Sequence, residues 1–425
     1  MGYRPINLFL PEVAMHRKTS HLSGLLIAAV CCVSLHAQTT GVWTNVSPAG
    51  LTTGQFGYGQ IAVNPNRLSD LYIGSGTGNS GVMKSTDYGK TWAQISTVQG
   101  WYGFGVTGTS PATVFMGTLT GDGSLYRSTD AGVTFQITGG GLASQPYNFF
   151  ADPYDVGHII IGLHEVDGVA ESNDTGRTFH MVSSTAMGTP GWPSGGVSWF
   201  PFFINTGTAS TTRGKWLAIG QNGGGVCMTT NGGASWSVPT ALAGLQHPHG
   251  TAQIFQTSST LFVAGIYGPG QGVYRSTDLG KTWARVDDGS QTEAAVWGSS
   301  QHIYAGYGWA MGAGGTVPLN YEVASQPGTS WSRSVSAPAG ISDGIWNIAI
   351  TNDGTNDIFV GSMWASGLWR FVEPAAITGV SQKVPALVRS AAPRSIALAR
   401  SGAAKMVITG TEGLFDVKGR NIKAR

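Results

Sequence analysis

Four acidic residues in predicted connecting segments could carry out acid–base chemistry. Glu165 and Asp167 lie two positions apart in one segment, and Asp343 and Glu293 lie in two later ones. Hydrolysis of a glycosidic bond needs two carboxyl groups, one protonated to assist the leaving oxygen and one ionised to activate water or attack carbon. We expect Asp343 to pair with Glu165 or with Asp167. Glu293 is the reserve.

The connecting segments that carry these acids are rich in aromatic side chains. Flat apolar rings with polar edges suit stacking against sugars, and nine of them are candidates: Trp101, Tyr102, Tyr147, Trp192, Trp199, Tyr267, Trp309, Trp346 and Trp364. No Lys or Arg lies on the same segments, although a substrate with a carboxylate, sulfate or phosphate would need a cation there. The pattern predicts a neutral glycan as ligand. The alternative for any single ring is a place in the core between sheets.

Three histidines form the other group of residues that could take part in chemistry. His247 and His249 flank a proline, and His164 lies beside Glu165. Two histidines at this spacing could shuttle protons, but loop histidines more often form local hydrogen bonds, and the spacing is not diagnostic of a metal site. We therefore expect no metal and no cofactor, and we place the three rings among the substrate-contacting residues.

One eight-residue phrase recurs six times along the chain. Its full form is Ser-x-Asp-x-Gly-x-Thr-Trp, and the copies are 85–92, 128–135, 172–179 and 276–283, with degraded versions at 229–236 and 324–331. A short Asp side chain can bond nearby backbone N–H groups, and Gly supplies the positive φ of a tight turn. The copies lie about 45 residues apart, which is the length of one four-stranded unit. The acids of the phrase are therefore expected to be structural.

A β-branched and aromatic run precedes each phrase, and a seventh run at 357–361 has no phrase after it. The segment 41–48 resembles the stretch that comes directly after a phrase elsewhere in the chain, so it can supply the missing strand. We predict an all-β fold: a seven-bladed β-propeller of four-stranded antiparallel blades, closed by the N-terminal strand. Closure leaves no open sheet edge. The candidate acids and rings would share one face of the propeller, and the phrases would lie on the opposite face.

The repeated phrase resembles the Asp-box, or BNR, repeats of sialidases and of xyloglucan-degrading glycoside hydrolases, over roughly residues 41–374. The strand pattern of the latter family is similar to residues 59–65 followed by 71–75. That family places one catalytic Asp where this chain has Gln60, and another in a loop that here spans 76–79 without an acid. It also works between two propellers, so its mechanism does not transfer unchanged. The three Arg of sialidases are missing from the candidate face.

The chain is predicted to have three parts. Residues 1–37 are an upstream extension and a signal peptide, because basic residues, an apolar run shorter than the ~20 residues of a membrane span and a small-residue cleavage site follow one another. Residues 38–374 form the propeller. Residues 375–425 form a basic tail, which resembles the sorting tails of proteins exported across a bacterial outer membrane or is a disordered segment. We expect the protein to be secreted or at the cell surface.

Composition narrows the classes of function. The 425 residues include 64 Gly, only 11% are charged, and the formal net charge is +2. The basic residues gather towards the ends and leave an acidic middle, so we expect no nucleic acid and no membrane as partner. We expect a monomer that hydrolyses a neutral, plant-type polysaccharide such as xyloglucan or another β-glucan. The alternatives are a non-catalytic glycan-binding or adhesion propeller and, third, a polysaccharide lyase with His164 or His249 as base.

Overall fold

The computed structural model describes most of the chain between Gly41 and Ala376. The described residues are 41–49, 59–74, 81–98, 103–118, 124–138, 142, 146–245, 254–265, 272–287, 295–306, 320–325, 328–336, 339–341, 344–363, 366–376, 408–410 and 413–415. The predicted signal peptide and most of the predicted tail lie outside them. Within these ranges no helix is long and apolar enough to cross a membrane.

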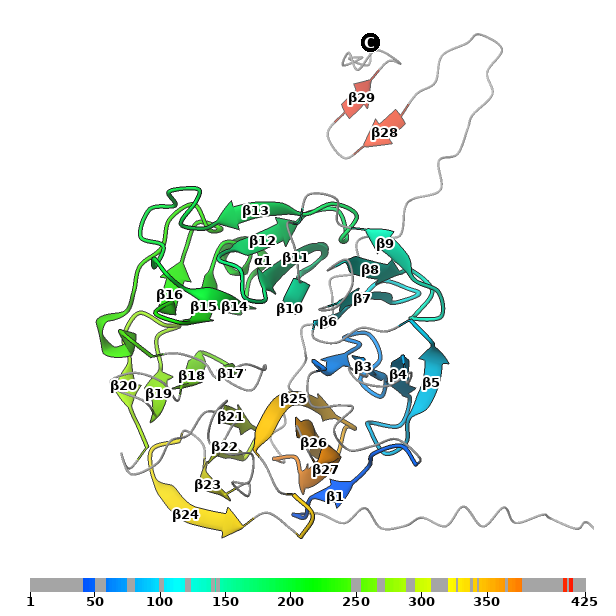
Figure 1. The fold of residues 1–425 in the computed structure, drawn as a ribbon, viewed down its shortest axis with the longest axis vertical. Helices are drawn as coiled ribbons and strands as arrows, with labels where there is room; N and C mark the ends of the chain where they lie inside the picture. Colours follow the sequence, from blue (N-terminus) through cyan, green and yellow to red (C-terminus); the bar gives the residue numbers. More distant parts are fainter. Residues whose placement is uncertain are drawn as a thin grey trace, which may run out of the picture. The chain divides into compact units, whose positions relative to one another are not determined.

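Seven antiparallel sheets follow one another around a central axis and form the blades of a propeller (Figure 1). The first three blades are β2 (Ala62–Val63), β3 (Leu71–Gly74), β4 (Val82–Ser85) and β5 (Ala93–Ser96); β6 (Phe104–Thr107), β7 (Thr113–Gly117), β8 (Leu125–Ser128) and β9 (Gln136–Thr138); and β10 (Pro146–Asp152), β11 (Asp155–Leu163), β12 (Val169–Ser172) and β13 (His180–Ser183). In each blade the first strand lies at the axis, and the predicted fold class is confirmed.

The remaining blades repeat this order. They are β14 (Val197–Phe203), β15 (Trp216–Gln221) and β16 (Gly225–Thr229); β17 (Ile254–Thr257), β18 (Thr260–Gly265), β19 (Gly272–Ser276) and β20 (Ala284–Arg285); β21 (Ala295–Gly298), β22 (His302–Gly306), β23 (Asn320–Ser325) and β24 (Trp331–Ser336); and β25 (Ile345–Asn352), β26 (Asn356–Met363), β27 (Gly367–Pro374) and β1 (Thr44–Asn45). Helix α1 (Ala209–Thr212) and the 3-10 turn η2 (Thr240–Leu242) flank blade 4. A separate hairpin pairs β28 (Ile408–Gly410) with β29 (Gly413–Phe415).

The N-terminal strand completes blade 7, as predicted. β1 pairs antiparallel with β27, with Thr44 opposite Arg370. Beside it, the Trp43 side chain is only 4% exposed, and its ring lies 5.3 Å from that of Phe371. The first and last parts of the propeller are thus joined in one sheet, which removes the open edge that either would otherwise present.

Blade 4 departs from the predicted four strands, because its sheet has three. Its outer segment makes a single bridge, between Ser237 and Met228. Pro239 follows two residues later and has no N–H to donate to a sheet, and η2 begins directly after it. The indole of Trp236 is nevertheless buried and donates to the Ser183 hydroxyl at 2.8 Å. The outer segment is therefore anchored by a side chain rather than by strand pairing.

Five of the repeated phrases are described, and each forms a turn in which its Asp, or Asn231 in blade 4, bonds its own backbone. We call the segments 85–92, 128–135, 172–179, 229–236 and 276–283 the aspartate turns. In the first, Asp87 accepts hydrogen bonds from the Ser85 hydroxyl at 2.8 Å, the Thr91 N–H at 2.9 Å and the Thr91 hydroxyl at 2.6 Å. Asp130, Asp174 and Asp278 repeat the pattern. These carboxylates are structural, in agreement with the sequence.

The aspartate turns also hold neighbouring blades together. Gly89 has φ +76°, and a Cβ there would lie 2.6 Å from Cγ2 of Val360 in the preceding blade. From the third strand of blade 7, Arg370 donates its Nε–H to the carbonyl of Tyr88 at 2.8 Å. Arg127 does the same to the carbonyl of Thr175. Glycine is thus required by both φ and contact, and these cations serve interblade bonding.

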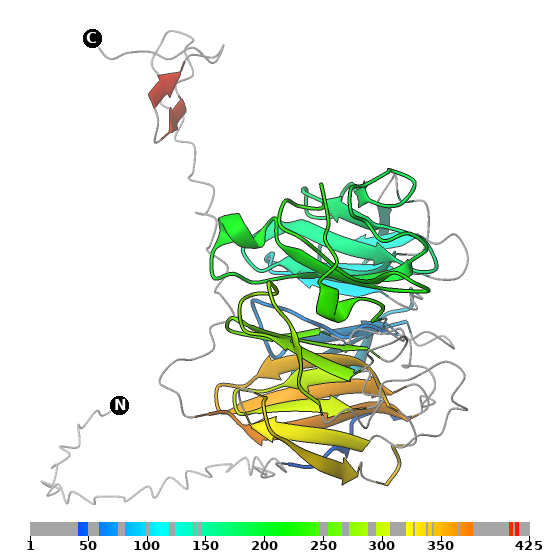
Figure 2. The same cartoon turned by 90° about the vertical axis from the view of Figure 1, so that its left-hand side faces the viewer.

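The core lies between the blades, whose sheets pack face to face in the side view (Figure 2). Buried side chains of neighbouring blades merge into common clusters, such as the one in which Trp297 and Tyr304 of blade 6 join Phe359 of blade 7. Cys227 is fully buried in blade 4, as expected. Packing between sheets is therefore what positions the loops at the two faces of the propeller.

Candidate functional site

The described residues of the candidate site lie on blades 3 and 4. We call the face that carries the connections between second and third strands the loop face, and the opposite one the turn face. The connections of blades 3 and 4 that lie on the loop face are the β11–β12 connection (164–168), the β13–β14 connection (184–196) and the β15–β16 connection (222–224). They contain no Lys or Arg, which the prediction of an uncharged ligand requires but which does not test it.

Asp167 ties two of these connections together. Its Oδ1 accepts the indole N–H of Trp192 at 2.8 Å and that of Trp199 at 3.1 Å, and its Oδ2 accepts the Thr185 N–H at 2.6 Å. A carboxylate already occupied by three protein donors has little capacity left for a substrate. Asp167 is therefore better explained as the anchor of the β13–β14 connection than as a catalytic group.

Four of the predicted stacking rings are buried, so the expectation that they are accessible is wrong. The side chains of Trp199, Tyr147, Trp346 and Trp192 are 0%, 1%, 2% and 8% exposed. Trp199 shows the reason, because its ring lies against Gly220, where a Cβ would approach it to 2.8 Å. These rings pack within the core rather than facing solvent, which was the alternative weighed for each of them.

Of the two predicted acids that the structure describes, Glu165 is the exposed one. It is exposed at the tip of the β11–β12 connection, with φ +52°, and its N–H donates to the Ser198 hydroxyl at 2.9 Å. Next to it, His164 is 5% exposed, and its ring lies 5.2 Å from that of Tyr147 in an edge-to-face arrangement. Burial lowers the pKa of His164 to about 4. A neutral, buried ring of low basicity is a poor base for a lyase.

The other predicted site residues lie outside the described part of the chain. They are Asp343, Glu293, Trp101, Tyr102, Tyr267, Trp309, Trp364, His247 and His249. No group of three or more His, Cys, Asp or Glu side chains suited to a metal occurs among the described residues. The carboxyl pair and the remaining stacking rings therefore stay predictions.

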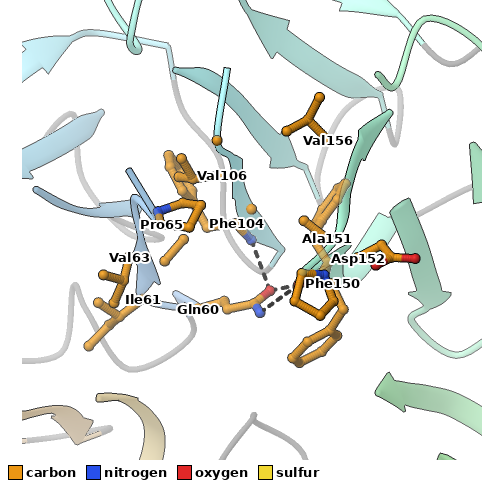
Figure 3. A pocket seen from close by; sticks show the side chains of 15 residues that line it. Gln60, Ile61, Val63, Pro65, Phe104, Val106, Phe150, Ala151, Asp152 and Val156 are labelled. Atoms are coloured by element: carbon orange, nitrogen blue, oxygen red, sulfur yellow. Dashed lines mark hydrogen bonds between the residues drawn. The ribbon is translucent and has the colours of Figure 1, made fainter. Parts of the chain in front are cut away.

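The structure adds a cavity of about 260 Å³ at the axis, between the innermost strands of blades 1, 2 and 3 (Figure 3). Its walls are mostly apolar, with Phe104, Phe149 and Phe150 among them, and Asp152 is the one charged lining residue. Gln60 lines it from blade 1. A cavity with a single carboxyl group does not have the pair that glycoside hydrolysis requires.

Gln60 connects the three innermost strands around this cavity. Its Oε1 accepts the N–H groups of Phe104 at 3.2 Å and Phe149 at 3.1 Å, and its Nε2 donates to the carbonyl of Phe149 at 3.1 Å (Figure 3). Gly103 and Gly105 leave room for Phe149 to approach. The side chain is 6% exposed. The residue that stands in place of an expected acid is thus a structural link between blades.

The sequence did not reveal that blade 3 contains a buried histidine between two acidic side chains. His158 is fully buried, with Nδ1 2.9 Å from Asp152 and Nε2 2.9 Å from Glu171. Burial lowers the pKa of His158, but the hydrogen bonds with the two carboxylates outweigh it and raise the pKa above its usual value. The available signal was that polar residues interrupt the apolar alternation of β11 and β12.

The curated proteins that resemble this chain are xyloglucanases. No family model matches the chain. In an alignment of 331 residues that covers 68% of this chain, it is 27% identical to a xyloglucanase of Hypocrea jecorina (strain QM6a), 38% of which is covered. In an alignment of 251 residues that covers 53% of the chain, it is 26% identical to a xyloglucanase of Acetivibrio thermocellus, with 25% of that protein covered. The chain is similar to xyloglucanases. It spans less than half the length of these relatives.

Solved structures agree on the fold. The GH74 xyloglucanase from Xanthomonas campestris superposes with a TM-score of 0.57 at 16% identity, over 77% of this chain and 53% of that one. An ancestral GH74 enzyme gives a TM-score of 0.53 at 14% identity, over 81% and 51% of the two chains. At such low identity these likenesses establish the propeller architecture alone.

Proposed function

We propose that this propeller is a secreted glycoside hydrolase that acts on a neutral, plant-type polysaccharide such as xyloglucan or another β-glucan. The observation that carries the proposal is the similarity to xyloglucanases over 331 residues. The described connections of blades 3 and 4 support it, because they hold an accessible carboxylate, Glu165, and no Lys or Arg. A neutral sugar chain needs hydrogen-bonding groups and no counter-charge.

The proposed mechanism uses two carboxyl groups on the loop face. Glu165 is one of them, since Asp167 is occupied by three protein donors. Asp343 is the proposed partner, and Glu293 is the alternative partner. One group, protonated, gives its proton to the leaving glycosidic oxygen, and the other, ionised, activates water or attacks the anomeric carbon. Whether the product retains or inverts its configuration depends on the separation of the pair.

The direct test is to incubate the purified full chain with xyloglucan and with mixed-linkage β-glucan and to measure new reducing ends. Glu165→Gln and Asp343→Asn should each lower kcat by about 10³-fold or more, because an amide neither donates nor accepts the transferred proton. Asp167→Asn is the matched control from the same connection. It should lower thermal stability and leave kcat of the folded enzyme within a few-fold. Unchanged turnover in Glu165→Gln would remove that residue from the mechanism.

A non-catalytic glycan-binding propeller is the second candidate, and Gln60 is the observation that favours it. This residue stands where the resembling hydrolases place an acid, and its amide accepts two backbone N–H groups and donates to one backbone carbonyl. Affinity gel electrophoresis separates the two functions. Retardation by xyloglucan without new reducing ends indicates binding alone, whereas hydrolysis that depends on Glu165 indicates catalysis.

A hydrolase of an external polysaccharide must be exported, and a single propeller can act as a monomer. We propose that the chain is secreted as a monomer after cleavage behind Ala37. The N-terminal sequence of protein recovered from the culture medium tests the first part, with Gln38 as the expected first residue. Light scattering of the purified protein tests the second.

A further inference from the structure

Backbone strain on the loop face gathers at one place. Eight non-glycine residues among those described have a left-handed φ. Four of them belong to aspartate turns and Ser258 to the β17–β18 hairpin. The other three, Glu165, Ser198 and Asn222, lie on the loop face of blades 3 and 4, with φ of +52°, +53° and +52°. Strain of this kind persists only where the surroundings impose it, and it clusters at functional sites.

Ser198 is strained because the innermost strand of blade 4 bulges there. The pairing of β14 with β15 shifts register between Val197 and Phe200, so two residues lack regular partners. Bulges of this kind redirect side chains and are over-represented next to active sites. The Ser198 side chain is fully buried and accepts the N–H of Glu165. The bulge thus aims a hydroxyl at the backbone of the one accessible acid described on this face.

Blade 3 holds the bulge in place from several sides. The Trp199 carbonyl accepts the Asn148 side-chain N–H at 3.4 Å, and it lies so close to Gly162 that no Cβ fits there. The Trp199 indole donates to Asp167. These contacts come from β10, β11 and the β11–β12 connection. The conformation of Ser198 is therefore over-determined by its neighbours, as a precise support requires.

We propose that Ser198 is a positioning residue for Glu165. Its hydroxyl holds the backbone of Glu165 in the left-handed conformation and so fixes the direction in which the carboxylate leaves the loop face. This role rests on the proposed hydrolase function. A carboxylate that must meet a glycosidic oxygen within hydrogen-bonding distance gains from such fixing, because a misplacement of about 1 Å can lower a rate by about 10²-fold.

The test compares two variants of Ser198 in the full chain. Ser198→Gly removes the hydroxyl but tolerates a positive φ, and Ser198→Ala removes the hydroxyl and keeps the strain. With xyloglucan as substrate, both should lower kcat by about 10- to 100-fold with KM within about twofold of wild type. Ser183→Ala is the matched control, because Ser183 is likewise a fully buried serine whose hydroxyl accepts an N–H, here that of the Trp236 indole, and it donates to the carbonyl of Gly233 rather than supporting a candidate acid. It should lower the melting temperature and leave kcat unchanged.

Amide hydrogen exchange gives a readout that does not depend on activity. The Glu165 N–H should exchange at least tenfold faster in Ser198→Gly than in wild type, because it loses its acceptor. Unchanged exchange would overturn the inference whatever the activity. Wild-type hydrolysis together with an unaltered kcat in Ser198→Gly would overturn it as well, while leaving the hydrolase proposal intact. A wild type that cleaves neither polysaccharide refutes the hydrolase function itself, and the positioning role falls with it.

Discussion

Nε2 of His158 lies 2.9 Å from Oε1 of Glu171 in the interior of blade 3. The opposite ring nitrogen lies 2.9 Å from Asp152. Nδ1 forms a hydrogen bond with Asp152, and the contact of Nε2 with Glu171 is an ion pair when the ring is protonated. The ring is fully buried and lies 4.9 Å from that of Phe203. Blade 3 therefore places a buried imidazole between two carboxylates, an arrangement that favours its protonated form.

This cluster predicts a stability maximum at mildly acidic pH. The pKa of His158 is raised in the folded protein, so its contribution is fully present below the unfolded pKa near 6.5 and is lost as pH rises through the higher folded value. Burial raises the pKa of Glu171, but His158, the Asn173 side chain and His180 together outweigh it, and the net shift is downwards. Its contribution is lost as pH falls below about 4.5. Melting temperatures between pH 4 and 9 should therefore peak between about pH 4.5 and 6.5.

Other charges near the cluster modify this profile without reversing it. Arg213 opposes the positive charge of His158 and is paired with Asp155 at 2.6 Å, and His180 lies 3.7 Å from Glu171. Glu171→Gln should lower the free energy of unfolding by about 3 kcal/mol at pH 6 and flatten its decline towards pH 9. A variant with the wild-type pH profile would contradict the assignment of that decline to His158.

Substitutions of the Asp in an aspartate turn should lower the stability of the protein to different extents. Hydrogen bonds from the Thr282 backbone and hydroxyl lower the pKa of Asp278 to about 2. Its contribution to stability is present above the unfolded pKa near 3.9 and is lost as pH falls through about 2. Asp278→Ala should therefore destabilise the protein at pH 7 by about 1–3 kcal/mol, measured by urea unfolding.

Asp278→Asn is the matched control, because blade 4 already uses an amide in this position. The Asn231 Oδ1 accepts the Ser235 N–H at 3.0 Å, and its Nδ2 donates to the Ser235 hydroxyl at 2.9 Å. Asp278→Asn should thus lose less stability than Asp278→Ala and remove the acid transition. Equal losses in both variants would show that the bonds to Thr282 contribute little.

Removal of the Gln60 side chain should destabilise the propeller at its axis. Gln60→Ala leaves the N–H groups of Phe104 and Phe149 without their acceptor in a buried place. The expected loss is about 2–4 kcal/mol in the free energy of unfolding, since each unsatisfied buried group costs about 1–3 kcal/mol. Gln60→Glu keeps the acceptor, loses the donor to Phe149 and should be less destabilised at low pH than at neutral pH. Wild-type stability in Gln60→Ala would show that the blades do not depend on this link.

The repeats made the architecture predictable, whereas the side-chain environment on the loop face was not. Glycine, aspartate and threonine at fixed spacing specify a turn locally, so the blades could be placed without knowing their neighbours. The exposure of Trp199 depends instead on Gly220 of the next strand and on Asp167 across a blade boundary, which lie far apart in the sequence. The same acid was expected to act on a substrate, because spacing alone does not show that two indoles occupy it.

Closure of blade 7 by the N-terminal strand gives the last prediction. Trp43 is 4% exposed and packs against Phe371, so Trp43→Ala should lower the free energy of unfolding by about 3–5 kcal/mol through lost burial and the cavity left behind. Val42→Ala, one position earlier and 47% exposed, is the control and should change it by less than about 0.5 kcal/mol. Chemical denaturation followed by tryptophan-independent far-ultraviolet circular dichroism measures both. If Trp43→Ala matched the control, β1 would be an accessory to a sheet that β25, β26 and β27 sustain on their own.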